Sequence, residues 1–417
     1  MNRIEQALFQ AEYDCFVRGD SATLKRLAED LMPLFKDHFL RVDVPGIQRR
    51  VRSLKELPSR PPIDSHYLLT HGIRGVVRYP ISTGEVIYKI PVFSFEMNDW
   101  KDHWTSVYLV LGAQTLTLVD TGTHLSEESL REGLEVVRTV YGEGIALEDI
   151  EHIVITHAHF DHFGGLNYTI PASQAKLWVH EWDAHTLSNY PVEVAKGQKR
   201  IARFLHQAGQ PPDEVDSFIQ MHDIGKQSFP GFAVQEAFID GQRIVEDFEV
   251  IHTPGHCPGL SCIRVGDVLL LGDQVLNHVT PHQFPKIYTS GSGLLNYLNS
   301  LIKVASHAEE VRLGLPSHYG DVPDIEARVM EIMNEHNQRI ADLMKDFSRP
   351  KTLADVTEDY YRFRKGRELE GYERLLALEE IGAHVEYMIE NLGILRVAAG
   401  SPGQGDDDQV VLYEKNP

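Results

Sequence analysis

Residues 153–166 read I-V-I-T-H-A-H-F-D-H-F-G-G-L, an apolar run followed by a dense group of metal-binding side-chain types. Three imidazoles and one carboxylate fall within six residues: His157, His159, Asp161 and His162. The apolar residues 153–155 predict a short buried strand, and Gly164-Gly165 allow a tight turn into the next element. Because alternate side chains of an extended backbone point the same way, the first two histidines suit a non-helical turn.

A chance grouping of histidines is the alternative to a metal site. The chain holds 21 His among 417 residues. At that frequency, three His and one Asp at fixed offsets arise by chance on the order of a few times per thousand chains of this length. The stretch therefore predicts metal binding, and its ligands could serve two neighbouring metals.

The composition is that of an acidic globular protein with two or three domains. Hydrophobic residues make up 42% and charged residues 24% of the 417 residues. The net charge of −21 disfavours broad binding to a phosphate backbone but allows a local basic patch. Cys15, Cys257 and Cys262 form no disulfide framework and predict a reducing compartment. The charged N-terminus and the lack of a long apolar run predict a cytoplasmic protein without a membrane partner.

The hydrophobic pattern divides the chain into three parts. Residues 1–62 predict a helical extension with a structural or dimerisation role, so that a homodimer is one expectation. Residues 63–325 alternate short strands with helices and predict the catalytic domain. Within it, residues 187–235 predict a polar helical insertion that covers a cleft and is the place to look for substrate selectivity. Residues 326–417 predict helices followed by a small hairpin (393–397 with 410–413), a winged-helix-like module.

Further apolar strands end in turns that carry His or Asp. The three later strand ends are 248–251 before H-T-P-G-His256, 268–271 before Gly-Asp273, and 313–315 before P-S-His318. Together with the opening stretch, four strand ends in this chain carry His or Asp. We interpret these strand ends as parts of one site rather than as a chance pattern. Asp120 follows the apolar segment 116–119 and, on this pattern alone, could be an ordinary turn residue.

These motifs resemble the metal-ligand set of the metallo-β-lactamase superfamily. The resemblance runs from roughly residue 65 to residue 325 and implies an α/β fold of the four-layer αββα type. His336, Arg339 and the run 377–395 resemble, less specifically, the winged-helix tail of a lactamase-like branch that includes an RNA endonuclease.

The resemblance implies a dinuclear metal site. The implied ligands are His157, His159 and His256 for the first metal, Asp161, His162 and His318 for the second, and Asp273 as a bridge. Such a donor set suits two Zn²⁺ ions, with Fe or Mn as realistic substitutes. A metal-bridged hydroxide is then the expected nucleophile. Asp161, the one catalytic residue expected beyond ligation, could hold or accept the water's proton. Asp120 matches the acid that orients a ligand histidine.

Three other residues near strand ends have weaker signals. His252 is predicted to be structural, because His256 holds the ligand position in the motif. His278 could face the cleft as a proton donor or keep a hydrogen-bonded structural role. Tyr319 could stabilise an oxyanion through its hydroxyl.

Three functions remain after this reading. The leading prediction is a metal-dependent hydrolase acting on a small acyl substrate, a thioester, ester or lactone. The alternative is an RNA or DNA nuclease or phosphodiesterase, favoured by the tail and by the basic and aromatic run 362–367, although a charge run is usually a solvated face. A non-catalytic regulatory protein is the third, and a complete ligand set argues against it.

Flavoprotein oxygen reductases of this superfamily carry Glu where this chain has His159, which disfavours their redox chemistry; a one-iron oxygenase stays open.

Overall fold

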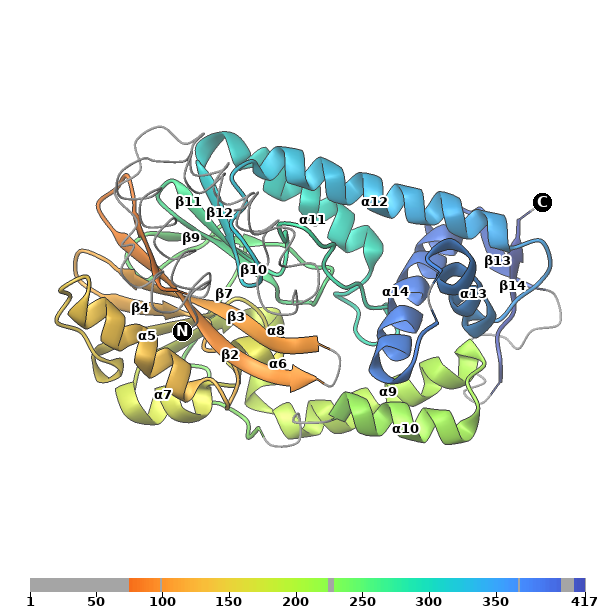
Figure 1. Cartoon of the computed structure of the whole chain (residues 1–417), viewed down its shortest axis with the longest axis horizontal. Coiled ribbons are helices and arrows are strands. Elements are labelled where there is room, and N and C mark those ends of the chain that lie inside the picture. Colours follow the sequence, from red (N-terminus) through yellow and green to blue (C-terminus); the bar gives the residue numbers. More distant parts are fainter. Residues whose placement is uncertain (1–74, 98–99, 224–228, 367, 399–408, 417) are drawn as a thin grey trace, which may run out of the picture.

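Two β-sheets pack face to face and carry helices on their outer faces (Figure 1). The computed structural model describes residues 75–97, 100–223, 229–366, 368–398 and 409–416. The predicted four-layer αββα fold is confirmed. The predicted helical extension 1–62 lies outside the described residues.

The first sheet has seven strands in sequence order. They are β1 (Val77–Pro80), β2 (Val86–Met97), β3 (Trp100–Leu111), β4 (Leu116–Val119), β5 (His152–Ile155), β6 (Lys176–His180) and β7 (Glu236–Phe238). The first four strands pair antiparallel, and β4 to β7 pair parallel. The carboxyl ends of β4 to β7 therefore meet at one edge of the sheet.

The second sheet has five strands in the order β12-β11-β10-β9-β8. Their bounds are β8 (Arg243–Ile244), β9 (Phe248–His252), β10 (Ser261–Val265), β11 (Val268–Gly272) and β12 (Leu313–Pro316). Since β9 and β11 each run antiparallel to β10, and β12 runs parallel to β11, the ends of β9, β11 and β12 also lie at one edge.

Side-chain alternation along the strands builds three apolar layers. In β4, Leu118 packs under the outer helices, whereas Val119 faces the space between the sheets. In β11, Leu269 faces the outer helices and Leu270 faces the other sheet. Because successive side chains of a strand point to opposite faces, a strand covered on both sides must be apolar throughout. The continuous apolar runs of the sequence have this cause.

Ten α-helices are described. Their bounds are α5 (Glu127–Thr139), α6 (Phe160–Phe163), α7 (Leu166–Ser173), α8 (Glu181–Ser188), α9 (Tyr190–Ala208), α10 (Pro212–Asp223), α11 (Leu294–Ser306), α12 (Ile325–Asp346), α13 (Leu353–Asp359) and α14 (Gly371–Glu390). Helices α5 and α7 cover the first sheet, and α11 and α12 cover the second. In the described part of the chain, every helix is too short or too polar to cross a membrane.

Helices α9 and α10, within the predicted insertion, pack against the C-terminal helices. They share one apolar cluster with α11 to α14, and Figure 1 shows α9 and α10 running beside α14. The long helix α12 begins on the sandwich beside α11 and extends to α13. The insertion and the C-terminal helices therefore form a continuous mass beside the two sheets.

The small C-terminal sheet differs in register from the predicted hairpin. Strand β13 (Leu395–Val397) pairs with β14 (Tyr413–Lys415), so β14 begins at the last residue of the predicted strand 410–413. Backbone hydrogen bonds in both directions join Tyr413 to Lys351, at 2.8 and 3.0 Å, and fix this register. The likeness of these helices and strands to a winged helix stays a prediction.

Candidate metal centre

Strand ends from both sheets bring the predicted ligands together. His157 and His159 follow β5, while His256, Asp273 and His318 follow β9, β11 and β12. Backbone hydrogen bonds fasten the two edges to each other: Ser261 N donates to Thr156 O at 3.0 Å, and Ser106 N donates to Ser317 O at 2.6 Å. The site is thus built where two sheets share one edge.

The opening stretch is locally bent and then helical. His157 and His159 lie in an irregular segment after β5, as predicted, but Asp161 and His162 lie on the one-turn helix α6 rather than on a continuing turn. Gly165 has ordinary helical dihedrals, so it is not needed for a tight turn. A Cβ atom there would lie 2.2 Å from the carbonyl oxygen of Thr121. The glycine permits a close backbone approach that sets α6 against the end of β4.

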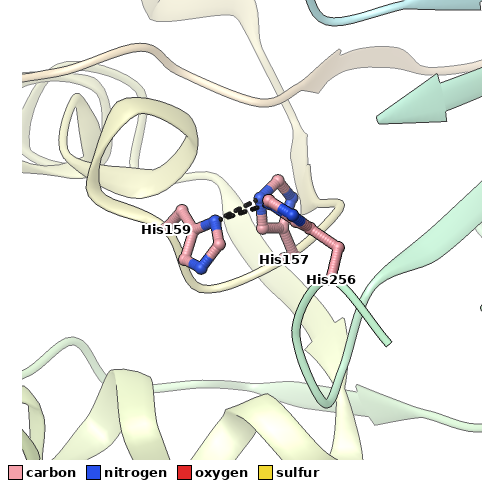
Figure 2. Close-up of side chains that lie close together, drawn as sticks. All are labelled: His157, His159 and His256. Atoms are coloured by element: carbon pink, nitrogen blue, oxygen red, sulfur yellow. Dashed lines mark hydrogen bonds between the residues drawn. The ribbon is translucent and has the colours of Figure 1, made fainter. Parts of the chain in front are cut away.

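Three histidines converge on one point, as Figure 2 shows. The Nδ1 atom of His159 lies 3.0 Å from Nε2 of His157 and 3.0 Å from Nε2 of His256. Burial and the neighbouring histidines hold the pKa values of His157 and His159 well below their usual range, and burial lowers that of His256. These rings are therefore neutral at pH 7, the form that binds metal ions.

The remaining predicted ligands form a second group beside the first. Nε2 of His318 lies 3.4 Å from Asp161 Oδ2, and Nε2 of His162 lies 3.6 Å from the same oxygen. Asp273 stands between the groups: its Oδ1 is 3.4 Å from His318 Nε2, and its Oδ2 is 3.6 Å from Nε2 of His256. All seven predicted ligand residues are thus gathered in overlapping groups.

Hydrogen bonds behind the rings fix which nitrogen faces inward. Nδ1–H of His162 donates to Asp120 Oδ2 at 2.9 Å, and Nδ1–H of His256 donates to the carbonyl oxygen of His282 at 2.7 Å. Nδ1–H of His318 donates to Trp104 O at 3.1 Å. Each Nε2 atom is left free to offer its lone pair to the centre, the arrangement expected behind metal-binding histidines.

Asp120 is held in a strained conformation at this point. Its φ of 60° lies in the left-handed region, which costs a non-glycine residue energy. Its buried carboxylate also accepts from Thr156 N at 2.8 Å and from Thr156 Oγ1 at 2.9 Å. The predicted orienting role of Asp120 toward a histidine of the cluster matches this geometry.

The buried carboxylates of the site favour the binding of cations. Burial alone would raise the pKa of Asp161 and of Asp273, yet neighbouring histidines lower both well below their usual range. In turn, although burial opposes it, these carboxylates raise the pKa of His162 to about 10. Buried His162 Nε2 and Asp273 Oδ1 find no hydrogen-bond partner among the described residues. A divalent cation would replace the protons and satisfy both atoms, so the residues fit bound metal.

Asp183 is a buried residue of the site that the sequence reading missed. Its Oδ2 accepts from Ala158 N at 2.8 Å, and its Oδ1 accepts from Gly259 N at 3.0 Å. One carboxylate therefore joins the His157–His159 loop to the loop that carries His256. A Cβ atom on Gly259 would come within 2.3 Å of the Asp183 carboxyl carbon, so a larger residue there would displace this carboxylate.

His103 was missed as well. It lies on β3, and its Nε2 is 3.6 Å from Asp161 Oδ2. Its ring stacks on Phe95 at 4.4 Å and lies 4.7 Å from the ring of His318. His103, Asp161 and His318 form a further group of side chains able to hold a metal ion.

Of the weaker predictions, Tyr319 lies at the site and the others pack beside it. Tyr319 has a φ of 64° and lines the cavity described below. The ring of His278 packs on it at 5.1 Å. His252 stacks on His180 at 3.8 Å, and its Nε2–H donates to Pro258 O at 2.7 Å, which agrees with the predicted structural role.

A cavity of about 690 Å³ opens from the cluster. Its floor includes His159, Asp161 and Asp273, and its walls are largely aromatic and aliphatic. The wall residues come from α9, from the loop before α11, and from α14. The insertion and the C-terminal helices thus enclose the space in front of the candidate metal ligands.

The C-terminal helix α14 also holds one of the ligand loops. Nε2–H of His282 donates to Glu379 Oε2 at 3.1 Å, and the His282 carbonyl accepts from His256. Glu380 accepts from Gln283 N at 2.8 Å and pairs with Arg339 of α12. The ring of His256 is therefore held, through His282, by a helix that lies more than a hundred residues later in the chain.

Comparisons with known proteins identify the family of this chain. The family model described as "Metallo-beta-lactamase superfamily" matches residues 104–313, half of the chain. "Probable metallo-hydrolase YqjP" of Bacillus subtilis is 23% identical over 302 residues, which cover 68% of this chain and 86% of that protein. "Metallo-beta-lactamase domain-containing protein 1" of Xenopus laevis is 40% identical over 184 residues, 39% of this chain and 75% of that protein.

Two solved structures share the fold. A metallo-beta-lactamase family protein of Thermus thermophilus superposes with a TM-score of 0.61 at 24% identity, covering 79% of this chain and 98% of that one. A beta-lactamase domain protein of Burkholderia ambifaria gives 0.63 at 20% identity, covering 82% and 94%. With the sandwich, the clustered histidines and aspartates and the family match in agreement, the chain belongs to the metallo-beta-lactamase superfamily.

Proposed function

We propose that this chain is a metal-dependent hydrolase that holds two divalent cations, most simply Zn²⁺, and cleaves a small ester, thioester or lactone. His157, His159 and His256 would hold one cation, and Asp161, His162 and His318 the other, with Asp273 facing both. The observation that carries the proposal is the largely apolar cavity that opens directly onto these residues. Largely apolar cavities with a few convergent polar groups are typical of small-molecule sites.

The chain's own residues have distinct tasks in such a reaction. Bound divalent cations lower the pKa of water toward neutrality and polarise the oxygen of the scissile bond. Asp161 Oδ2 is assigned to accept the proton that the attacking water loses. His103 Nε2, 3.6 Å away, positions that carboxylate. Tyr319 offers its hydroxyl from the cavity wall as a donor to the developing oxyanion.

A panel of substrates with defined metal loading tests the proposal. We expect about two metals per chain by elemental analysis, and turnover of thioesters, esters or lactones. His159→Ala should lower kcat/KM by about a hundredfold or more, because a ligand position is lost. The matched control is His185→Ala, an exposed histidine on α8, which should leave kcat/KM unchanged. Equal activity of His159→Ala and the parent would contradict the proposal.

One observation favours a nuclease as the second candidate. Phe363 is 73% exposed within the basic run, and Arg362 lies over its ring at 5.9 Å. Exposed aromatic and basic side chains are used by proteins that bind single-stranded nucleic acid. Cleavage of single-stranded RNA by the metal-loaded protein, with no turnover of acyl substrates, would establish this candidate instead. Metal content of one iron per chain would point to an oxygenase.

A further inference from the structure

One stripe of helix α9 forms a wall of the cavity. Tyr190, Val194, Gly197 and Ile201 all line it, at intervals of three or four residues. This spacing places side chains on one face of a helix. The ring of Tyr190 contacts that of Phe163, the residue after His162, at 4.7 Å. The N-terminal end of α9 is therefore the end near the candidate metal ligands.

Gly197 leaves a gap in this wall. It lies in the interior of α9, where glycine is less favourable than alanine. A Cβ atom built on Gly197 would meet no atom of the described residues within 4 Å, so no close packing requires the glycine. Its missing side chain instead widens the cavity in the middle of the stripe.

Arg200 provides a cation farther along the same wall. Two guanidinium groups line the cavity, and that of Arg339 is already paired with Glu380. Nε of Arg200 is buried and has no hydrogen-bond partner among the described residues. The nearby acid Glu193 accepts from Lys196 Nζ at 2.7 Å. After Lys196, the charge of Arg200 also lowers the pKa of Glu193, so an anion from outside the chain would share Arg200 with Glu193.

We propose that the α9 wall binds an extended apolar chain that ends in an anionic group such as a carboxylate. The apolar chain would lie over Gly197, between Val194 and Ile201, and the anion would pair with Arg200. The helical stretch from Tyr190 to Arg200 spans about 15 Å. The inference rests on the proposed function, because it specifies the substrate class: acyl compounds with a long apolar part and a remote negative charge.

Binding of two fatty acids of equal length tests the wall without turnover. Isothermal titration of the full-length protein with dodecanedioate and with dodecanoate should give about five- to tenfold tighter binding of the dicarboxylate. Arg200→Gln should abolish that difference, because the second carboxylate loses its partner. Lys199→Gln, an exposed neighbour outside the cavity, should keep it.

A second variant tests the gap. Gly197→Leu should weaken binding of both acids by about tenfold or more while the melting temperature stays equal or rises, since leucine is the better helix former. The matched control Ala195→Leu, on the exposed side of α9, should bind both acids like the parent. Equal affinity of the parent for the two acids, retained preference in Arg200→Gln, or unchanged binding in Gly197→Leu would each overturn the inference. Failure of acyl turnover with these binding results intact would instead count against the proposed function alone.

Discussion

Asp183 links two loops that the chain delivers from different sheets. Its two carboxylate oxygens each accept one backbone N–H, from Ala158 and from Gly259. The loops carry His157, His159 and His256, so the spacing of the three rings depends on this carboxylate. Residues that support metal ligands from behind commonly alter metal affinity as strongly as they alter activity.

Asp183→Asn should loosen the metal centre without unfolding the protein. An amide keeps one acceptor, but its NH₂ group then faces the other backbone N–H, so one buried donor loses its partner. We expect the Kd for Zn²⁺, measured by chelator competition, to rise by about 10- to 100-fold. The control Glu181→Gln changes an exposed acid in the first turn of the same helix and should leave the Kd unchanged. A Kd unaltered by Asp183→Asn would refute the linking role.

The sequence could predict some site residues and not others for a physical reason. The seven predicted ligands sit in short motifs at strand ends, and the resemblance to the metallo-β-lactamase superfamily implied that they form one set. Asp183 has the sequence signature of an ordinary acid in the first turn of a helix, which the helix dipole favours anywhere. His103 lies in the long strand β3, where no turn residue marks it. Both reach the site through tertiary packing that local patterns do not record.

Helix α14 carries an unusual density of buried polar groups. Glu379 and Glu380 hold the loop at His282, and Nε2 of His384 accepts a hydrogen bond from Nδ1–H of His336 at 3.0 Å. Farther along the same helix, Glu386 accepts from the backbone N–H of Lys286 at 2.9 Å. A single helix thus contacts the cavity-forming loop along much of its length.

Glu386 makes this element sensitive to pH. Burial raises its pKa from 4.5 to about 7 in the folded protein. Because the folded value lies above the unfolded one, its contribution to the free energy of unfolding is complete below pH 4.5 and is lost as the pH rises through 7. Glu386→Gln should therefore stabilise the protein by roughly 1–3 kcal/mol at pH 8 and by little at pH 5.

Urea denaturation at the two pH values measures this difference. The control is Glu358→Gln, which changes an exposed residue on α13. The change in the free energy of unfolding that this substitution causes should be the same at both pH values. A Glu386→Gln variant that is equally stabilised at pH 5 and pH 8, or destabilised at pH 8, would contradict the assignment.

At the scale of elements, the strongly patterned segments were predictable. The apolar runs of β5, β9, β11 and β12 lie within one residue of their predicted bounds. Strands β2 and β3 are 12 residues long each, longer than the short runs predicted. Their pairing shifts register between Phe93 and Phe95 and again between Phe95 and Met97, which a simple alternation along the sequence does not record. The register of β14 depends on Lys351, far away in sequence.

On the scale of the whole molecule, the candidate ligands come from both halves of the sandwich. His157 to His162 follow the first sheet, and His256, Asp273 and His318 follow the second. Any ion that bridges them ties the two sheets together. Binding to the folded state alone adds about 4 kcal/mol to the free energy of unfolding when the free ligand exceeds its Kd a thousandfold.

Chelation should therefore lower the melting temperature of the metal-loaded protein. We expect a fall of roughly 5–10 °C by differential scanning fluorimetry, reversed when Zn²⁺ is restored. His159→Ala should show a smaller fall, and His185→Ala the same fall as the parent. If verified removal of the metal leaves the melting temperature where it was, the ions do not join the sheets.

The cavity walls arise in a definite order during synthesis. The clustered residues lie between positions 157 and 318, whereas the wall residues Tyr361, Tyr372 and Leu376 lie later in the chain. Since chains emerge from the ribosome N-terminal end first, all the clustered residues are synthesised before α14. The α9 wall is synthesised before His256 and Asp273, so it is the α14 side of the cavity that stays open until translation is nearly complete. Helix α14 therefore both closes the cavity and completes the support behind His256 at a late stage of synthesis.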